Sequence, residues 1–125
     1  MQPRLNIITL GVQDLGKAIQ FYRDGLGWPM SGDSVGDFAI LKTSTGNALA
    51  LYPRDLLAKD ANAMDLGGFG GITLAQNVET REEVDRVLSE AAKSGGKIFK
   101  PAQEADWGGY SGYFADLDGH VWELA

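Results

Sequence analysis

Apolar residues in the first half of the chain follow a strand spacing and then a helix spacing. Residues 5–12 are rich in Ile and Leu with partial alternation, which predicts a half-buried strand. Asp14 is placed to cap a helix in which apolar residues recur at intervals of three and four. The stripe consists of Leu15, Ala18, Ile19, Tyr22 and Leu26. Residues 28–52 then predict three short strands, with breaks at residues 31–36 and 45–47, where Gly and Asn tolerate positive φ.

The second half repeats this order of elements. Residues 72–78 predict a strand, and Thr80 with Glu83 forms a capping box at the start of a second amphipathic helix. The apolar stripe of this helix consists of Val84, Val87, Leu88, Ala91 and Ala92. Three further strands are predicted at residues 97–103, 110–116 and 121–124. Between the halves, a short helix at residues 54–63 precedes a flexible joint at residues 67–71, where four of the five residues are Gly.

The two halves align with each other at two constant offsets. Residues 72–78 follow residues 6–12 at an offset of 78 − 12 = 66. Setting Gly119 on Gly46 aligns a strand, a turn and a second strand in each half, at an offset of 119 − 46 = 73. Self-similarity at roughly half the chain length indicates two copies of one supersecondary unit. We therefore predict an α+β fold of tandem βαβββ repeats that form a curved mixed sheet around a cavity.

The repeat also predicts how the chain is divided. We expect one domain over residues 1–125, because a chain of 125 residues is too short for two independent cores. Within it, residues 4–53 form the first half, residues 54–70 the connector and residues 71–125 the second half. A helix covers one face of each repeat, so we expect a ligand on the other face.

Composition narrows the range of partners. The net charge of −6 and the pI near 4.6 argue against nucleic acid, which is bound by basic surfaces, and against an anionic membrane. The chain has no Cys, so it offers neither a disulfide nor a thiolate ligand. No N-terminal apolar stretch resembles a signal peptide, and no apolar run approaches the roughly 20 residues of a membrane span. We expect a cytoplasmic protein that binds neither nucleic acid nor membranes.

Two motifs link this repeat to a known family. The first is V-x-D-L followed by F-Y-x-D-G-L-G-W in residues 12–28, and the second is F-A-D-L-D-G-H-V-W-E in residues 114–123. In this order they resemble the vicinal oxygen chelate superfamily, the glyoxalase/bleomycin-resistance/dihydroxybiphenyl dioxygenase fold. That group includes glyoxalase I, extradiol dioxygenases, fosfomycin-resistance transferases and bleomycin-resistance proteins. The resemblance covers essentially the whole chain and implies a homodimer in which two chains complete each cavity.

The resemblance also indicates where a metal would be held. Catalytic members use one residue of the first strand and one of the last strand in each repeat, and the matching positions here are Ile7, Ala50, Thr73 and Glu123. Divalent ions need about three or four N, O or S donors, and only Glu123 is a usual ligand. The one histidine, His120, is three residues from Glu123 and would point to the opposite face of a strand. We predict no metal and no cofactor, with a divalent ion held through Glu123 as the alternative.

Glu123 is the candidate catalytic or ligand-orienting residue, because the resemblance places it on the concave face; a relic held by a hydrogen bond is the other interpretation. Tyr113 shares its face if residues 117–119 form a three-residue loop, whereas a two-residue loop brings Phe114 there. In the fosfomycin-resistance relatives a Tyr at the matching position lines the substrate site. Thr73 is a further candidate for ligand binding.

Three aromatic residues are candidates for the same cavity. Trp107 and Tyr110 flank two glycines and could close over a flat ligand, or could cover the core beside a bulge. Tyr52 is a cavity wall or a core residue.

The sequence therefore favours one function over an enzymatic alternative, besides a third possibility, a domain whose cavity is closed by side chains and that serves only as a dimerising module. We favour metal-independent binding of a small, partly aromatic or apolar organic molecule, similar to the bleomycin-resistance proteins. The alternative is a metal-dependent lyase or isomerase resembling glyoxalase I (lactoylglutathione lyase-like), or a dioxygenase-like enzyme.

Overall fold

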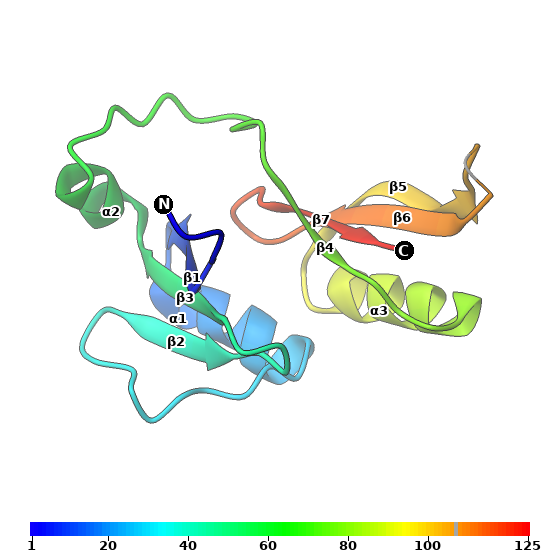
Figure 1. Cartoon of the computed structure of the whole chain (residues 1–125), viewed down its shortest axis with the longest axis horizontal. Coiled ribbons are helices and arrows are strands. Elements are labelled where there is room, and N and C mark those ends of the chain that lie inside the picture. The colour runs from blue at the N-terminus through cyan, green and yellow to red at the C-terminus, as the bar shows by residue number, and fades with distance from the viewer. Residues whose placement is uncertain (107) are drawn as a thin grey trace. The chain divides into compact units, whose positions relative to one another are not determined.

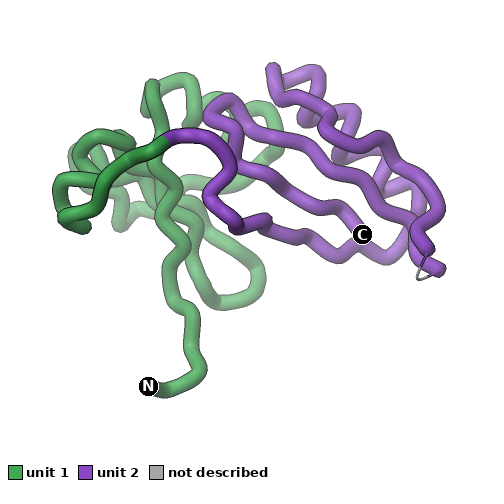
Figure 2. Tube along the Cα trace, turned by 90° about the horizontal axis from the view of Figure 1, so that it is seen from above, with its two compact units in different colours: residues 1–66 green, residues 67–125 purple. Residues whose placement is uncertain are grey.

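The chain forms two compact units, residues 1–66 and residues 67–125, in a computed structural model that describes residues 1–106 and 108–125 (Figure 2). The first unit contains β1 (Ile7–Val12), α1 (Leu15–Ile19), the π-helical turn η1 (Gln20–Gly25), β2 (Ala39–Lys42), β3 (Ala48–Pro53) and α2 (Arg54–Asp60). The second contains β4 (Thr73–Gln76), α3 (Arg81–Lys93), β5 (Lys97–Glu104), β6 (Tyr110–Ala115) and β7 (Val121–Leu124) (Figure 1). The α+β prediction is confirmed, and each sheet is open, with unpaired edge strands.

In the first unit, a sheet of order β1-β3-β2 packs against α1 and η1. Strand β1 runs parallel to β3, and β2 runs antiparallel to it. Asp14 caps α1 as predicted, because its carboxylate accepts the Lys17 backbone N–H at 3.0 Å. The buried face is apolar and includes Leu10, Val12, Phe21, Tyr22, Leu41, Leu49 and Leu51.

The first helix differs from the prediction in its second half. It changes from α to π geometry at Gln20, and the Leu26 N–H donates to the Phe21 carbonyl five residues earlier, at 3.0 Å. The wider turn leaves both Phe21 and Tyr22 almost fully buried, at 2% and 1% exposed. The predicted apolar stripe, which assumes α-helical spacing throughout, contains Tyr22 but not Phe21. The ring of Trp28 then meets Tyr22 edge to face, with the centroids 6.3 Å apart.

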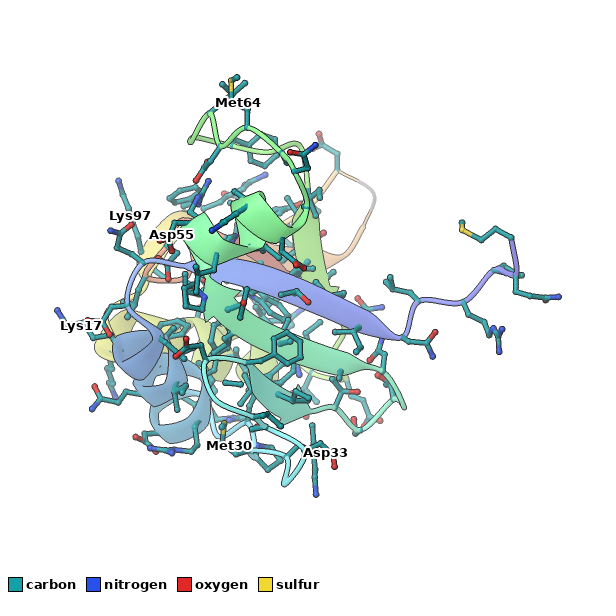
Figure 3. The ribbon with its side chains drawn as sticks, turned by 90° about the vertical axis from the view of Figure 1, so that its left-hand side faces the viewer. Lys17, Met30, Asp33, Asp55, Met64 and Lys97 are labelled. Carbon is teal, nitrogen blue, oxygen red and sulfur yellow. The ribbon has the colours of Figure 1, made fainter. Side chains whose placement is uncertain are left out.

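The prediction of three strands over residues 28–52 was wrong by one strand. Only β2 and β3 form there, and the segment before them makes an isolated bridge, Met30 with Leu41. Pro29 has no N–H to donate, although its carbonyl still accepts the Lys42 N–H at 2.9 Å. The pairing therefore cannot extend, and the chain leaves the sheet at the turn that contains Asp33, close to Met30 (Figure 3).

In the second unit, a sheet of order β4-β7-β6-β5 has α3 on one face. Thr80 caps α3 by accepting the Glu83 N–H at 3.1 Å. Gly112 lies directly beneath the helix, because a Cβ at that position would stand 2.6 Å from Leu88 Cδ1. The apolar core between helix and sheet includes Val84, Leu88, Ala91, Phe114, Trp122 and Leu124.

The two sheets reproduce the repeat in their strand registers. Ile7 pairs with Ala48, and the two offsets carry this pair to 7 + 66 = 73 and 48 + 73 = 121, which is the observed pair of Thr73 with Val121. The turn glycine Gly46 has φ 91°, and its equivalent Gly119 has φ 84°. The two units therefore share a backbone plan down to single positions.

The part of the connector that follows α2 is exposed. Residues 61–71 are all exposed, and the side chain of Met64 projects from it (Figure 3). Helix α2 lies within the predicted helix of residues 54–63, and Arg54 at its start makes a two-point ion pair with Asp65, at 2.6 and 2.9 Å. That all 125 residues act as one domain stays a prediction. Within the described residues, every helix is too short or too polar to cross a bilayer.

Candidate functional site

The candidate site lies on the face of the second sheet that α3 does not cover. Successive side chains of a strand point to opposite faces, and Trp122 and Leu124 of β7 are buried on the helix side. Glu123, between them, therefore projects from the other face, the open face of the second unit. Across the strands, Glu123 is paired with Ala75 on β4 and with Tyr113 on β6.

The turn between β6 and β7 fixes this register. Asp116 and His120 close it, with the Asp116 N–H donating to the His120 carbonyl at 2.9 Å, and Gly119 adopts positive φ. The buried carboxylate of Asp116 accepts the N–H groups of Asp118 and His120 at 2.9 and 2.8 Å. Of the two loops that the sequence left open, the three-residue loop is present, and it brings Tyr113 rather than Phe114 opposite Glu123.

Tyr113 and Glu123 form a coupled pair of polar groups. Burial, the negative charge of Glu123 and a side-chain hydrogen bond between the two groups together raise the pKa of Tyr113 above its ordinary value. The phenol is therefore neutral at pH 7 and can act as a donor toward the Glu123 carboxylate. Both side chains are half-buried, so the pair also has access to a molecule on the open face. A carboxylate beside a phenol can accept hydrogen bonds from an ammonium or a hydroxyl.

Thr73 lies on the same face, beside this pair. It is paired with Val121, two residues before Glu123 on β7, so the side chains of Thr73 and Glu123 project in the same direction from adjacent strands. The first unit has the equivalent arrangement with different chemistry. Ile7 and Ala50 share a face of adjacent strands there, since Ile7 is two residues from Thr9, the partner of Ala50.

These four positions do not fit a divalent metal ion. Ile7 and Ala50 carry no N, O or S atom in their side chains, and Thr73 offers a neutral hydroxyl. In residues 1–106 and 108–125, no three His, Asp or Glu side chains stand close enough together to hold an ion. His120 lies in the β6–β7 turn, where its backbone N–H binds the Asp116 carboxylate. Glu123 alone falls short of the three or four donors of a firm site.

Tyr110 lies on the helix side of the sheet, away from Glu123. Its hydroxyl donates to Asp85 of α3 at 2.8 Å, and the Arg81 guanidinium carbon stands 4.9 Å from the centre of its ring. The hydrogen bond to Asp85 raises the pKa of Tyr110, with smaller contributions from burial and from the charge of Asp85. This position matches the alternative in which Tyr110 covers the core.

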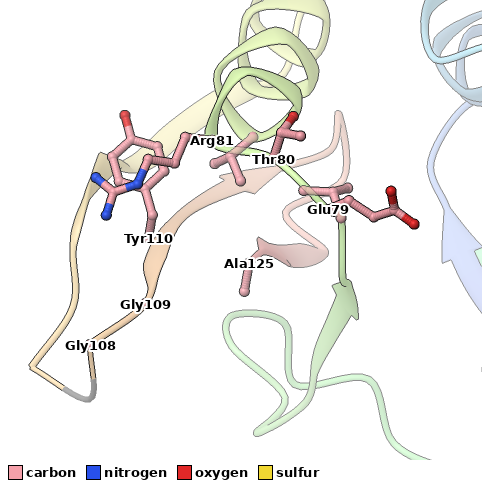
Figure 4. A pocket seen from close by; sticks show the side chains of 9 residues that line it. Glu79, Thr80, Arg81, Gly108, Gly109, Tyr110 and Ala125 are labelled. Carbon is pink, nitrogen blue, oxygen red and sulfur yellow. The ribbon is translucent and has the colours of Figure 1, made fainter.

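Tyr110 also lines a pocket of about 270 Å³ at the start of α3 (Figure 4). In this view the Arg81 side chain lies against the Tyr110 ring, and the Glu79 carboxylate points away from them. The lining residues are Val78, Glu79, Thr80, Arg81, Val84, Gly108, Gly109, Tyr110 and Ala125. Arg81 could not be identified from the sequence, because its contact with Tyr110 joins residues 29 positions apart and leaves no local pattern.

The two other aromatic candidates are placed differently. Tyr52 belongs to the first unit, where it is half-buried and meets Phe38 edge to face, with ring centroids 5.7 Å apart. Trp107 lies outside the described residues.

The chain combines a repeat, open sheets and paired strand positions, and this combination indicates one protein family. The model of the Glyoxalase/Bleomycin resistance protein/Dioxygenase superfamily matches residues 4–124. The chain belongs to this superfamily. No curated protein matches it significantly. The resemblance inferred from the motifs of residues 12–28 and 114–123 is confirmed.

Solved structures of the same superfamily agree with this assignment. A glyoxalase-related enzyme from Fulvimarina pelagi is 32% identical, with a TM-score of 0.89 over 98% of this chain and 87% of that chain. A glyoxalase/bleomycin resistance protein/dioxygenase family enzyme from Burkholderia phytofirmans is 19% identical, with a TM-score of 0.83 over 95% and 94% of the two chains. A glyoxalase/bleomycin resistance protein/dioxygenase from Nocardioides is 23% identical, with a TM-score of 0.79 over 99% and 83%. The last two likenesses concern the fold alone.

Proposed function

We propose that this member of the superfamily binds a small organic molecule on the open face of the second unit without a metal ion. The observation that supports the proposal is the pair of Glu123 and Tyr113, a carboxylate and a phenol held opposite each other by the β6–β7 turn. The pair supplies hydrogen-bonding groups, whereas the positions that would complete a metal site carry Ile7, Ala50 and Thr73.

The chemistry of this face defines the kind of molecule that fits. The neighbours of the pair in the strand register are apolar and suit a flat apolar body; Ala75 is exposed, whereas Ala115 and Val121 are already buried. Burying such a body contributes roughly 25 cal/mol per Å² of apolar area, offset by the entropic cost of binding. The carboxylate of Glu123 then orients an ammonium or hydroxyl group of the ligand. We infer an aromatic or apolar molecule that carries at least one such donor.

We also propose a homodimer, in which the second copy of the chain would contribute residues to the open face of the second unit. It is supported by the open edges of the two sheets and by exposed apolar side chains such as Ile7 and Phe99, at 48% and 53% exposed. Sedimentation velocity at several protein concentrations distinguishes a dimer from a monomer. A monomer at all concentrations would remove the dimer from the proposal.

Two simple phenols, only one of which carries an amine, test the binding function. We expect tyramine, which carries a ring and an ammonium group, to bind more tightly than 4-ethylphenol in isothermal titration calorimetry. Glu123→Gln should weaken tyramine binding at least about tenfold, as expected for the loss of a hydrogen bond to a charged group. Glu82→Gln, an exposed carboxylate on α3, is the control and should bind tyramine like the unaltered protein.

The same experiment separates binding from the competing activity. If chelator treatment abolishes tyramine binding, the protein uses a metal, and a glyoxalase-like lyase or isomerase, or a dioxygenase-like enzyme, becomes the better description. If Glu123→Gln binds tyramine unchanged, the open face of the second unit is not the site.

A further inference from the structure

Two lysines of β5 border the same open face as Glu123. Lys97 is paired with Ala115, and Lys100 is paired with Tyr113. The register shifts between Ile98 and Lys100, so one extra residue of β5 is inserted opposite β6. This bulge places Lys97 and Lys100 on one face although they are an odd number of residues apart. Strict alternation along β5 would have put them on opposite faces.

The lysines on this edge have no carboxylate partner in the described ranges, residues 1–106 and 108–125. Every ion pair found there is made by an arginine: Arg23 with Asp24, Arg54 with Asp65, Arg81 with Glu104 and Arg86 with Glu90. The Lys97 ammonium instead lies over the ring of Phe99, 5.8 Å from its centre. Lys100 is exposed. In a chain of net charge −6, this edge therefore presents two positive charges that are free to meet an anion.

Glu123, Tyr113 and Lys100 form one row across three strands. Glu123 is paired with Tyr113, and Tyr113 with Lys100. Neighbouring strands lie about 5 Å apart, so the backbones of Glu123 and Lys100 are separated by about 10 Å. The row has a carboxylate at one end, an ammonium at the other and a phenol between them. A body about the width of one aromatic ring with short arms spans this separation.

We propose that the open face of the second unit selects amphoteric molecules, which carry an amine or hydroxyl group at one end and an anionic group at the other. The donor end meets Glu123 and Tyr113, and the anionic end meets Lys100 with Lys97 beside it. This inference rests on the proposed function and specifies its ligand class. A simple anion binds weakly because Glu123 repels it. A simple cation makes no favourable contact with Lys100.

A matched pair of compounds tests the selection. The first is 4-(aminomethyl)phenylacetate, and the second is its primary amide, which keeps the ring and the ammonium group but lacks the negative charge. In calorimetry at low salt we expect the unaltered protein to bind the carboxylate about fivefold more tightly than the amide, the upper range for one exposed ion pair. At about 1 M salt the preference should disappear.

Lys100→Met keeps an unbranched side chain only one atom shorter and removes its charge, so it should bind the two compounds equally. Lys93→Met, an exposed lysine at the end of α3, is the control and should retain the preference. Circular dichroism verifies that both variants are folded.

The outcomes separate this inference from the proposed function. If tyramine binding depends on Glu123 but the protein binds the carboxylate and the amide equally, the amphoteric selection is overturned and the proposed function stands. A preference that persists in Lys100→Met overturns the role of Lys100. If neither tyramine nor 4-(aminomethyl)phenylacetate binds, the proposed function fails as well.

Discussion

The first and second units have the same backbone plan but different chemistry at equivalent positions. Ile7 corresponds to Thr73, and Ala50 corresponds to Glu123, in strand registers that match residue for residue. The first unit therefore presents alkyl groups where the second presents a hydroxyl and a carboxylate. Backbone geometry is fixed by capping groups and turn glycines, whereas the side chains on the open face vary independently of it. The fold is thus a poor guide to the chemistry, which has to be argued from the individual residues.

The helices of the two units differ in a similar way. Asp14 and Thr80 cap them at equivalent positions, since 14 + 66 = 80. Helix α3 then continues for 13 residues, whereas α1 gives way to a π-helical turn after five. The start of each helix is conserved between the repeats, and its continuation depends on the side chains that each unit has to bury.

Substitution of the turn glycines Gly46 and Gly119 is the test of the equivalence of the two units with the largest expected effect. Gly46→Ala and Gly119→Ala force a side chain into positive φ with no atom near the new methyl group, so backbone strain is the main cost. We expect each substitution to lower the free energy of unfolding by about 1 to 2 kcal/mol in urea denaturation. Gly32→Ala, also in open space but without positive φ, is the control and should be neutral or slightly stabilising. A loss confined to one of the two turns would contradict the equivalence.

The helix caps test the same equivalence with a smaller effect. Asp14→Ala and Thr80→Ala each remove the side-chain acceptor for an N–H in the first turn, at 3.0 and 3.1 Å. Each substitution should lower the free energy of unfolding by about 1 kcal/mol, measured by the same denaturation. Ser89→Ala, exposed in the middle of α3, should cause no loss because Ala is the better helix former. An unaffected Asp14→Ala would indicate that α1 is held by packing alone.

The titration of Tyr113 sharpens the description of the second unit. We expect the pKa of Tyr113 to lie above its ordinary value and to fall in Glu123→Gln, because the charge and the hydrogen bond of Glu123 are removed while burial remains. Site-resolved ¹³C NMR of the tyrosine rings, assigned with Tyr113→Phe, measures this shift. Asp85→Asn should instead lower the pKa of Tyr110 and leave that of Tyr113 unchanged. A Tyr113 pKa that is insensitive to Glu123 would contradict the coupling.

The same shift has a consequence for stability at high pH. A pKa raised in the folded state means that the folded protein holds the phenol proton more firmly than the unfolded chain does. The stabilising contribution of Tyr113 is therefore complete below about pH 10, the pKa of an unfolded tyrosine, and is lost as the pH rises through the folded value. The free energies of unfolding of the unaltered protein and of Tyr113→Phe, measured by urea denaturation, should therefore approach each other as the pH rises through the folded value.

Much of the fold could be predicted because short-range signals determine it. The capping groups, the turn glycines and the apolar spacing act within a few residues of each other, and together they located β1, α3 and the pairing of Tyr113 with Glu123. The missing strand before β2 follows from Pro29, whose lack of an N–H is visible in the sequence but was not used in the prediction. The π-helical turn could not be predicted in the same way, because it depends on how Phe21 and its neighbours pack against a sheet that local sequence does not describe.

The candidate site was predictable where register alone determined it. The resemblance to the superfamily indicated Glu123, and the three-residue turn places Tyr113 opposite it, whereas Lys100 reaches the same face only through a bulge in β5. The neighbouring glycines made Tyr110 a candidate for the cavity, but its hydroxyl donates to Asp85 on the helix side. An aromatic residue next to a flexible segment does not by itself reveal which face of the sheet it covers.

Metal analysis decides whether the donors on the binding face of the second unit fall short of a metal site. The protein is purified without chelators, incubated with zinc, passed through gel filtration and analysed by inductively coupled plasma mass spectrometry. Our account predicts far less than one zinc ion per chain, both in the unaltered protein and in Glu123→Ala. One zinc ion per chain that survives gel filtration and is lost in Glu123→Ala would contradict it.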